Sequence, residues 1–169
     1  MVDFVYELAA TSWSTQLRES LYLYSIIESA HVLGLGLFLG PVFILDFNLL
    51  RNRLDGAQVD KLAARLFPFA VVGGVIMFLT GSLLFYSVPI RTFHSLWFRL
   101  KLAFILGAAI NLIIFHGFTR SRARHARSHG LISLIAWVAV IACGRLIAYG
   151  WFDCDQKDIS WLRWITQCP

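Results

Sequence analysis

The chain has 169 residues, of which 58% are hydrophobic and only 15% are charged, and its mean hydropathy is +0.67. These values exclude an ordinary water-soluble domain, in which about a quarter of the residues are charged. The net charge of +5 must therefore lie mostly outside the apolar stretches, and we expect an all-α integral membrane protein.

Four apolar stretches are long enough to cross a bilayer as helices. A hydrocarbon core of about 30 Å needs roughly 20 helical residues, because each residue adds about 1.5 Å. The predicted spans cover Leu21–Leu50, Leu66–Val88, Leu96–Phe118 and Leu131–Tyr149. Small residues recur in every span, which favours close helix packing. The sequence therefore predicts an up-and-down four-helix bundle over residues 21–150.

Two shorter segments flank the predicted bundle. Residues 1–20 carry Asp3 and Glu7 and have no basic stretch before an apolar core, so they do not read as a cleavable signal peptide but as an interfacial segment. Residues 151–169 form a tail with three tryptophans among charged residues, typical of an interfacial helix or of a surface that docks another subunit.

The positions of Lys and Arg predict the orientation of the bundle. Cytoplasmic loops are enriched in basic residues. The first and third connections carry most of them: Arg51, Arg53, Lys61, Arg65, Arg120, Arg122, Arg124 and Arg127. Both termini are therefore expected on the outer, periplasmic side of an inner (cytoplasmic) membrane. The basic third connection fits this topology and contact with anionic lipid, so no nucleic acid partner is expected.

The cysteines agree with this topology. Cys154 and Cys168 both follow the fourth span, on the oxidising side, which favours a disulfide between them. Cys143 lies within the fourth span and is expected to be a small packing residue.

Glu28 and His31 interrupt the first apolar stretch. An ionisable side chain in hydrocarbon costs about 2.5–3.5 kcal/mol on insertion scales, so it needs a partner or a function. Glu28 lies about 10 Å and His31 about 15 Å below the outer boundary, on one helix face. Lys101 and Arg145 reach a similar level from the third and fourth spans. We expect these four side chains to form an outer cluster that binds a guest molecule.

The composition of this outer cluster fits a b-type haem. His31 would be an axial ligand with His94 as its candidate partner, and Lys101 and Arg145 would neutralise the propionates. Glu28 would orient the other ring nitrogen of His31. The predicted function is an electron-transfer subunit, rather than a stand-alone catalyst, that connects an outer-side redox partner with the quinone pool.

Other interpretations of the outer cluster stay open. Met77 is an alternative second ligand for the iron. A buried ion pair of Glu28 with Arg145 or Lys101 would satisfy the cluster without any ligand, as in a cofactor-free accessory subunit of a larger complex. A quinone could occupy the cluster, and a copper or small-solute transport component is the remaining alternative.

A second polar group is expected toward the inner side. Its members are Asp46 and Asn48 at the end of the first span and Asn111 and His116 at the end of the third. We expect Asp46 to pair with a nearby base such as Arg51. If His116 were a ligand, His129 could join it in holding a second, inner haem.

Short motifs in the spans also carry a family resemblance. They are Glu28-Ser-Ala-His31-Val-Leu-Gly34-Leu with Gly40 and Asp46-Phe-Asn-Leu-Leu50, Thr80-Gly81-Ser-Leu-Leu-Phe85, Phe98-Arg-Leu-Lys101-Leu with Asn111, and Gly144-Arg145-Leu-Ile-Ala-Tyr149. In this order they resemble a widespread bacterial four-helix membrane family of unassigned function, over Leu21–Tyr149. More distantly they are similar to copper-resistance-D-like proteins and haem-binding four-helix membrane proteins. The resemblance implies a cofactor or metal in the bundle. Membrane lipid and other membrane or periplasmic redox subunits are the partners that we expect from the predicted spans and function.

Overall fold

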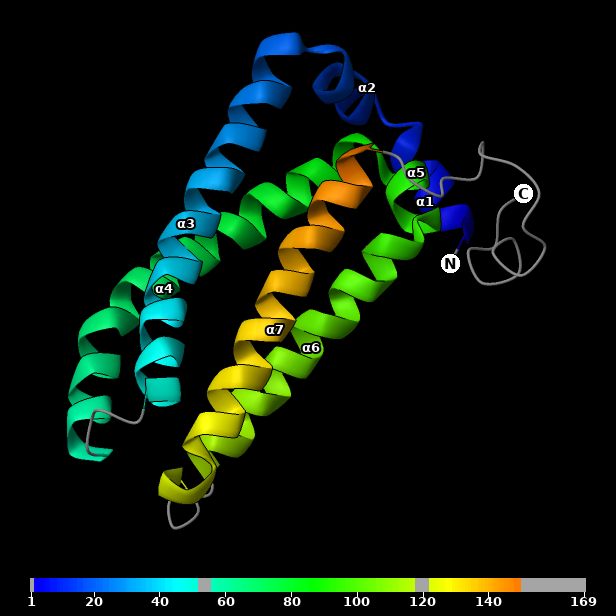
Figure 1. Cartoon of the computed structure of the whole chain (residues 1–169). Coiled ribbons are helices and arrows are strands. Elements are labelled where there is room, and N and C mark those ends of the chain that lie inside the picture. Colours follow the sequence, from blue (N-terminus) through cyan, green and yellow to red (C-terminus); the bar gives the residue numbers. More distant parts are fainter. Residues whose placement is uncertain (1, 52–55, 118–121, 150–169) are drawn as a thin grey trace.

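A computed structural model describes residues 2–51, 56–117 and 122–149, and within these ranges the protein is helical with no strand (Figure 1). The helices are α1 (Val2–Ala9), α2 (Ser12–Glu19), α3 (Leu21–Arg51), α4 (Gly56–Ser87), α5 (Pro89–His94), α6 (Leu96–Gly117) and α7 (Arg122–Tyr149). The all-α class predicted from the sequence is confirmed.

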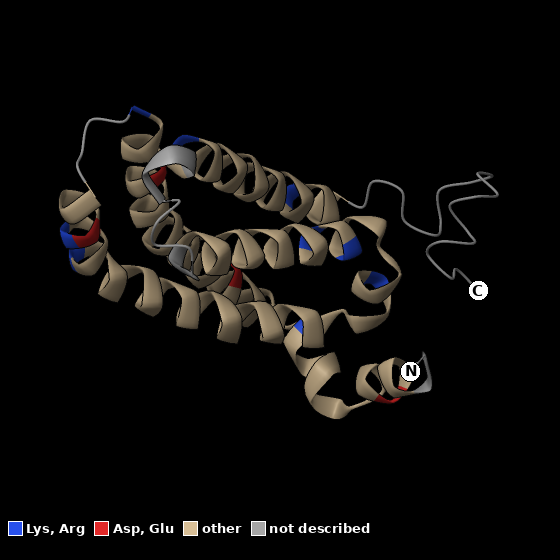
Figure 2. Ribbon diagram, turned by 90° about the horizontal axis from the view of Figure 1, so that it is seen from below, with Lys and Arg blue, Asp and Glu red and all other residues tan. Residues whose placement is uncertain are grey.

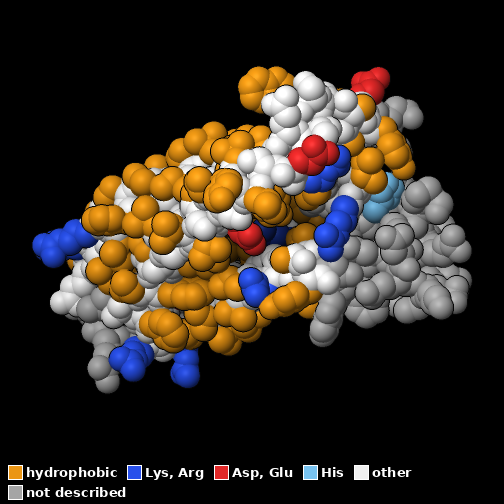
Figure 3. Space-filling model, turned by 90° about the horizontal axis from the view of Figure 1, so that it is seen from above, with side chains coloured by type: hydrophobic (Ala, Val, Ile, Leu, Met, Phe, Trp, Pro, Cys, Tyr) orange, Lys and Arg blue, Asp and Glu red, His pale blue; other side chains and the backbone are white. Residues whose placement is uncertain are grey.

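Four of these helices, α3, α4, α6 and α7, are long and apolar enough to cross a membrane. Large hydrophobic side chains cover much of the outer surface (Figure 3). Phe78, for example, is 75% exposed. Soluble proteins rarely expose apolar patches of this extent, whereas lipid tails solvate them. The surface therefore supports a multi-pass membrane protein in contact with lipid.

The long helices alternate in direction. Helix α3 packs most extensively against α4 and α6 against α7, while contacts between α3 and α7 join the two pairs (Figure 1). The short helices α1, α2 and α5 gather at one end, here called the α5 end. The last turn of α3 and the first turn of α4 lie at the opposite end, here called the Arg51 end. The positions of charged residues concentrate toward both ends of the ribbon (Figure 2).

Two of the long helices extend beyond the apolar spans predicted for them. Helix α4 begins at Gly56 and includes Asp60 and Lys61, and α7 begins at Arg122. Asp60 and Lys61 are exposed, so these polar turns continue the helix past the apolar core. Because a helix satisfies its own backbone hydrogen bonds, it can leave the hydrocarbon without a break.

The N-terminal segment is fixed to the α5 end by hydrogen bonds. The Thr11 hydroxyl caps α2 by accepting from the backbone N–H of Ser14 at 3.4 Å, and lies 2.6 Å from the Tyr86 hydroxyl. Ser14 donates to the Tyr86 carbonyl oxygen at 2.8 Å. Trp13 is 70% exposed between these contacts. The predicted interfacial segment thus folds as two short helices tied to the end of α4.

Helices α3 and α4 meet backbone to backbone. A methyl group at Gly73 would lie 2.8 Å from the Leu37 carbonyl carbon and would also collide with the backbone nitrogen of Phe38. A methyl group at Gly34 would lie 2.7 Å from the Ile76 side chain. Pro41, four residues after Leu37, has no N–H to donate to the Leu37 carbonyl, so the closest approach falls where the α3 hydrogen-bond ladder is interrupted.

A cluster of buried apolar side chains lies at the Arg51 end. Leu49 of α3, Val59 of α4 and Phe115 of α6 form one buried cluster. Gly130 brings α7 against the same turn of α3, since a methyl group there would lie 3.1 Å from the Asp46 carbonyl oxygen. All four long helices therefore converge at this end.

We predict that Gly73→Ala lowers thermal stability, because the added methyl group must push α4 away from the α3 backbone. Overpacking of this kind costs about 1–3 kcal/mol. Gly107→Ala is the matched control, since a methyl group at Gly107 meets nothing within 4 Å. Thermal unfolding of the purified variants in detergent, followed by circular dichroism, measures both. Equal midpoints for the two variants would show that the α3–α4 contact is not tight.

Candidate functional site

His31 on α3 is held by Thr80 on α4. The His31 Nδ1 and the Thr80 hydroxyl oxygen are 2.8 Å apart. The Thr80 hydroxyl donates to the Ile76 carbonyl of its own helix at 2.6 Å. Because a hydroxyl has one hydrogen, Thr80 must accept from His31, and Nδ1 carries the proton. In neutral His31 the lone pair is then on Nε2, the ring nitrogen that is not hydrogen-bonded to Thr80.

The imidazole of His31 also packs against the backbone of α4. A methyl group at Gly81 would lie 3.3 Å from the His31 Cε1 atom. A residue with a side chain at position 81 would therefore press on the ring. Thr80 and Gly81 together fix both the orientation of the ring and its distance from α4.

Lys101 on α6 is the charged residue that the structure brings to this histidine. Its ammonium interacts electrostatically with His31 and with Cys143 of α7. The Lys101 Nζ lies 3.7 Å from the position of a Cβ atom at Gly144, so a glycine leaves room for the ammonium beside α7. Within the described ranges, no hydrogen bond or ion pair of Nζ to a carboxylate is seen. His31, Thr80, Lys101 and Gly144 thus bring all four long helices to one centre, here called the His31 centre.

Glu28 and Arg145 lie on more exposed faces. Glu28 is exposed, and its carboxylate interacts electrostatically with Tyr24 of its own helix. Arg145 donates to the Tyr149 hydroxyl at 2.6 Å, and its guanidinium lies 5.0 Å from the centre of that ring. Among the residues that the structure describes, no salt bridge joins Glu28 to Lys101 or Arg145. The partner of His31 Nδ1 is accordingly Thr80 and not Glu28.

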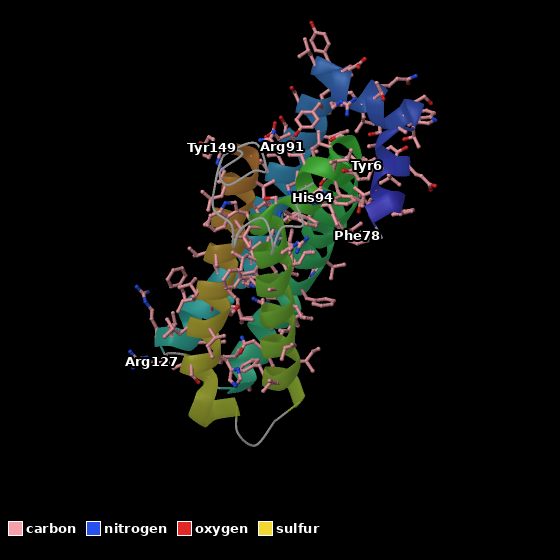
Figure 4. All side chains as sticks on the ribbon, turned by 90° about the vertical axis from the view of Figure 1, so that its right-hand side faces the viewer. Tyr6, Phe78, Arg91, His94, Arg127 and Tyr149 are labelled. Carbon is pink, nitrogen blue, oxygen red and sulfur yellow. The ribbon has the colours of Figure 1, made fainter. Side chains whose placement is uncertain are left out.

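His94 belongs to the short helix α5. Its ring is edge-on to Phe93 at a centroid distance of 5.5 Å, and the residue is only 5% exposed. It lies at the same end of the bundle as Tyr6, Arg91 and Tyr149, opposite Arg127 (Figure 4). This is the same half of the bundle as the His31 centre, where His31 is hydrogen-bonded to Thr80.

Met77 lies on α4, three residues before Thr80, and is half-buried.

The polar residues near the Arg51 end form two hydrogen-bonded pairs. Asp46 is 5% exposed and accepts a side-chain hydrogen bond from Ser133 of α7. Asn111 of α6 donates to the His129 carbonyl at 3.0 Å, and its Oδ1 lies 2.7 Å from His129 Nδ1. The proton of His129 is therefore also on Nδ1. Arg51, the expected partner of Asp46, is exposed, and Ser133 takes its place.

The remaining predictions concern His116, the three cysteines and a metal site. The side chain of His116, and both Cys154 and Cys168, lie outside the described residues. Cys143 is buried and free. Within 2–51, 56–117 and 122–149, no three His, Cys, Asp or Glu side chains gather as a set that could hold a metal ion. A single histidine with a cofactor-borne metal remains compatible with this geometry, whereas a protein-only metal centre has no donor set there.

Two residues of this arrangement are missed by the site prediction from sequence. Thr80 and Ser133 are neutral hydroxyl residues, which spans commonly tolerate when the hydroxyl bonds back to the helix. What distinguishes these two hydroxyl residues is a hydrogen bond to an ionisable residue on another helix, and the sequence of a single span does not reveal such a contact.

Comparison with known proteins adds no guidance, since the chain matches no protein-family model, no curated protein and no solved structure.

Proposed function

We propose that this protein is a b-type cytochrome-like subunit that transfers electrons within a membrane. The observation that carries the proposal is the hydrogen bond from His31 Nδ1 to Thr80, because it leaves Nε2 as the lone-pair nitrogen. Neutral imidazole with one nitrogen hydrogen-bonded to the protein is the form in which histidine binds haem iron. The donor set therefore fits haem b with His31 as one axial ligand.

Lys101 supports a guest molecule with negative charge. An ammonium inside a bundle is costly unless an anion faces it, and no carboxylate does so in the described part of the chain. The propionates of haem carry that charge, and Lys101 already interacts electrostatically with His31. Lys101 would thus bind one propionate, and Arg145, exposed at the same end, would bind the second.

The protein's own groups have separate tasks in this proposal. His31 binds the iron, and Thr80 fixes the plane of the imidazole and the position of its proton. Gly81 and Gly144 leave room beside His31 and Lys101. Haem, when bound, supplies the one-electron redox chemistry. His94 would hold the iron together with His31, with Met77 as the alternative to His94.

We further propose the membrane in which the protein lies, its orientation and its partners. The basic residues of the first and third connections support an inner (cytoplasmic) bacterial membrane with both termini on the periplasmic side. An outer-side redox partner and the quinone pool would then exchange electrons through the bundle. Glu28 supports a protein partner, because an exposed carboxylate about 10 Å below the membrane surface is stabilised when another subunit covers it.

The absorption spectrum tests the cofactor. Protein purified in detergent from haem-supplied cells is expected to show a Soret band, which His31→Ala abolishes because the iron loses its ligand. His129→Ala, at the opposite end of the bundle, is the control and should keep the band. A colourless wild-type protein would end the haem proposal. Stoichiometric partner proteins copurifying with that colourless form would instead identify a cofactor-free accessory subunit.

A second prediction concerns Thr80. Thr80→Val keeps the shape of the side chain but removes the hydroxyl that accepts from His31 Nδ1. Loss of such a hydrogen bond typically costs about 10–100-fold in metal affinity. Haem titration of the apoprotein should show this loss, and Thr80→Ser should restore affinity. In the apoprotein, ¹⁵N NMR of labelled histidine should show the Nδ1–H tautomer of His31 in the wild type and a mixture in Thr80→Val. An unchanged tautomer and affinity in Thr80→Val would remove Thr80 from the site.

The orientation can be tested with reporter fusions. Alkaline phosphatase fused after Pro169 should be active, because that end is expected in the periplasm. The same reporter fused after Asp55, in the first basic connection, should be inactive. The reverse pattern would place the basic connections outside and overturn the proposed topology.

A further inference from the structure

Asp46 is a buried carboxyl group that the proposed electron-transfer function does not use. It lies on α3, where Gly130 allows α7 to approach the backbone of the same residue. The residue is 5% exposed and belongs to one of the four membrane-spanning helices. Its environment is therefore determined by the protein and not by water.

Only one of the two carboxyl oxygens is satisfied. The side chain accepts a hydrogen bond from Ser133, while Oδ2 is buried with no hydrogen-bond partner among the described residues. The titratable side chains described nearby do not compensate a charge there. His129 on α7 donates its Nδ1 proton to Asn111. The charged side chains that the structure describes at this end are exposed, namely Arg51, Asp60, Lys61, Arg65 and Arg127.

The energetic cost differs greatly between the two forms of this carboxyl. A neutral hydroxyl buried without a hydrogen bond costs about 1–3 kcal/mol in proteins, whereas an unpaired buried carboxylate costs far more. An ionised Asp46 would leave one charged oxygen buried without a hydrogen-bond partner among the described residues. A hydrogen atom on Oδ2 removes the charge and needs no additional space.

We propose that Asp46 is a proton-binding site in the half of the bundle near the Arg51 end, with the proton on Oδ2 and the hydrogen bond from Ser133 on Oδ1. The ligand of this site is a proton, and a metal ion is not required. The inference does not depend on haem or on electron transfer.

Infrared spectroscopy of the purified protein at mildly acidic pH, where exposed carboxyl groups are still ionised, tests this inference. The carbonyl stretch of a protonated carboxyl group lies well above that of a carboxylate and moves down in D₂O. A band of this kind is expected in the wild type and should be absent in Asp46→Asn. It should persist in Asp60→Asn, which makes the same substitution at an exposed position of α4.

A second variant covers the case in which Asp46→Asn does not fold. Ser133→Ala keeps the carboxyl group but removes the hydrogen bond to it, so the protonated band should move to higher wavenumber and remain present. If the wild type has no protonated carboxyl band, or if the band is unaffected by Asp46→Asn and Ser133→Ala, Asp46 is ionised and the proposed site is refuted.

Discussion

The close contact between α3 and α4 determines how the rest of the bundle is arranged. Gly34 and Gly73 let the two backbones touch where Pro41 interrupts the hydrogen-bond ladder of α3. Since the helices are antiparallel, this contact also sets which residues face each other farther along. His31 comes to lie opposite Thr80 for that reason. A bulkier residue at the crossing would separate the helices and the hydrogen-bonded pair together.

Each principal helix interface contains one polar pair with an ionisable member. His31 and Thr80 join α3 to α4, Asp46 and Ser133 join α3 to α7, and Asn111 and His129 join α6 to α7. A hydrogen bond between membrane helices contributes on average only about 0.6 kcal/mol. Such pairs stabilise the bundle modestly, but each has favourable geometry in only one rotation of its helices. They therefore specify the rotational register that small apolar residues alone would leave loosely defined.

The sequence predicts the elements of this fold better than the contacts between them. Length and hydropathy identify the four spans because hydrocarbon thickness imposes them directly. The polar, amphipathic pattern of residues 57–65 already predicts a helical lead into α4, whereas the extension of α7 to Arg122 is missed because its residues are polar. The short helix α5 begins at Pro89, a favourable first position, but six residues give little periodicity from which to predict it.

Part of the site is predictable for a similar reason. The number of residues from the boundary of a span gives the depth of a side chain in the membrane, and this predicts a similar depth for His31 and Lys101. The rotation of each helix about its axis is not given by depth. The spacing of three residues predicts that Glu28 lies beside the His31 ring. In the structure the His31 ring faces α4, whereas Glu28 is exposed. Asp46 is hydrogen-bonded to Ser133 and not paired with Arg51, because its carboxyl group is buried whereas the Arg51 side chain is exposed.

The attachment of the N-terminal helices has a consequence for α4 as a whole. Tyr86 is hydrogen-bonded through its hydroxyl to Thr11 and through its carbonyl to Ser14, so the end of α4 cannot rotate unless α2 moves with it. Thr80 lies within two helical turns of Tyr86. A displacement of α2 would therefore act first on Tyr86 and, through the same helix, on the turn of α4 that carries Thr80. The two N-terminal helices are thus connected, through hydrogen bonds to one helix, with the residue that holds His31.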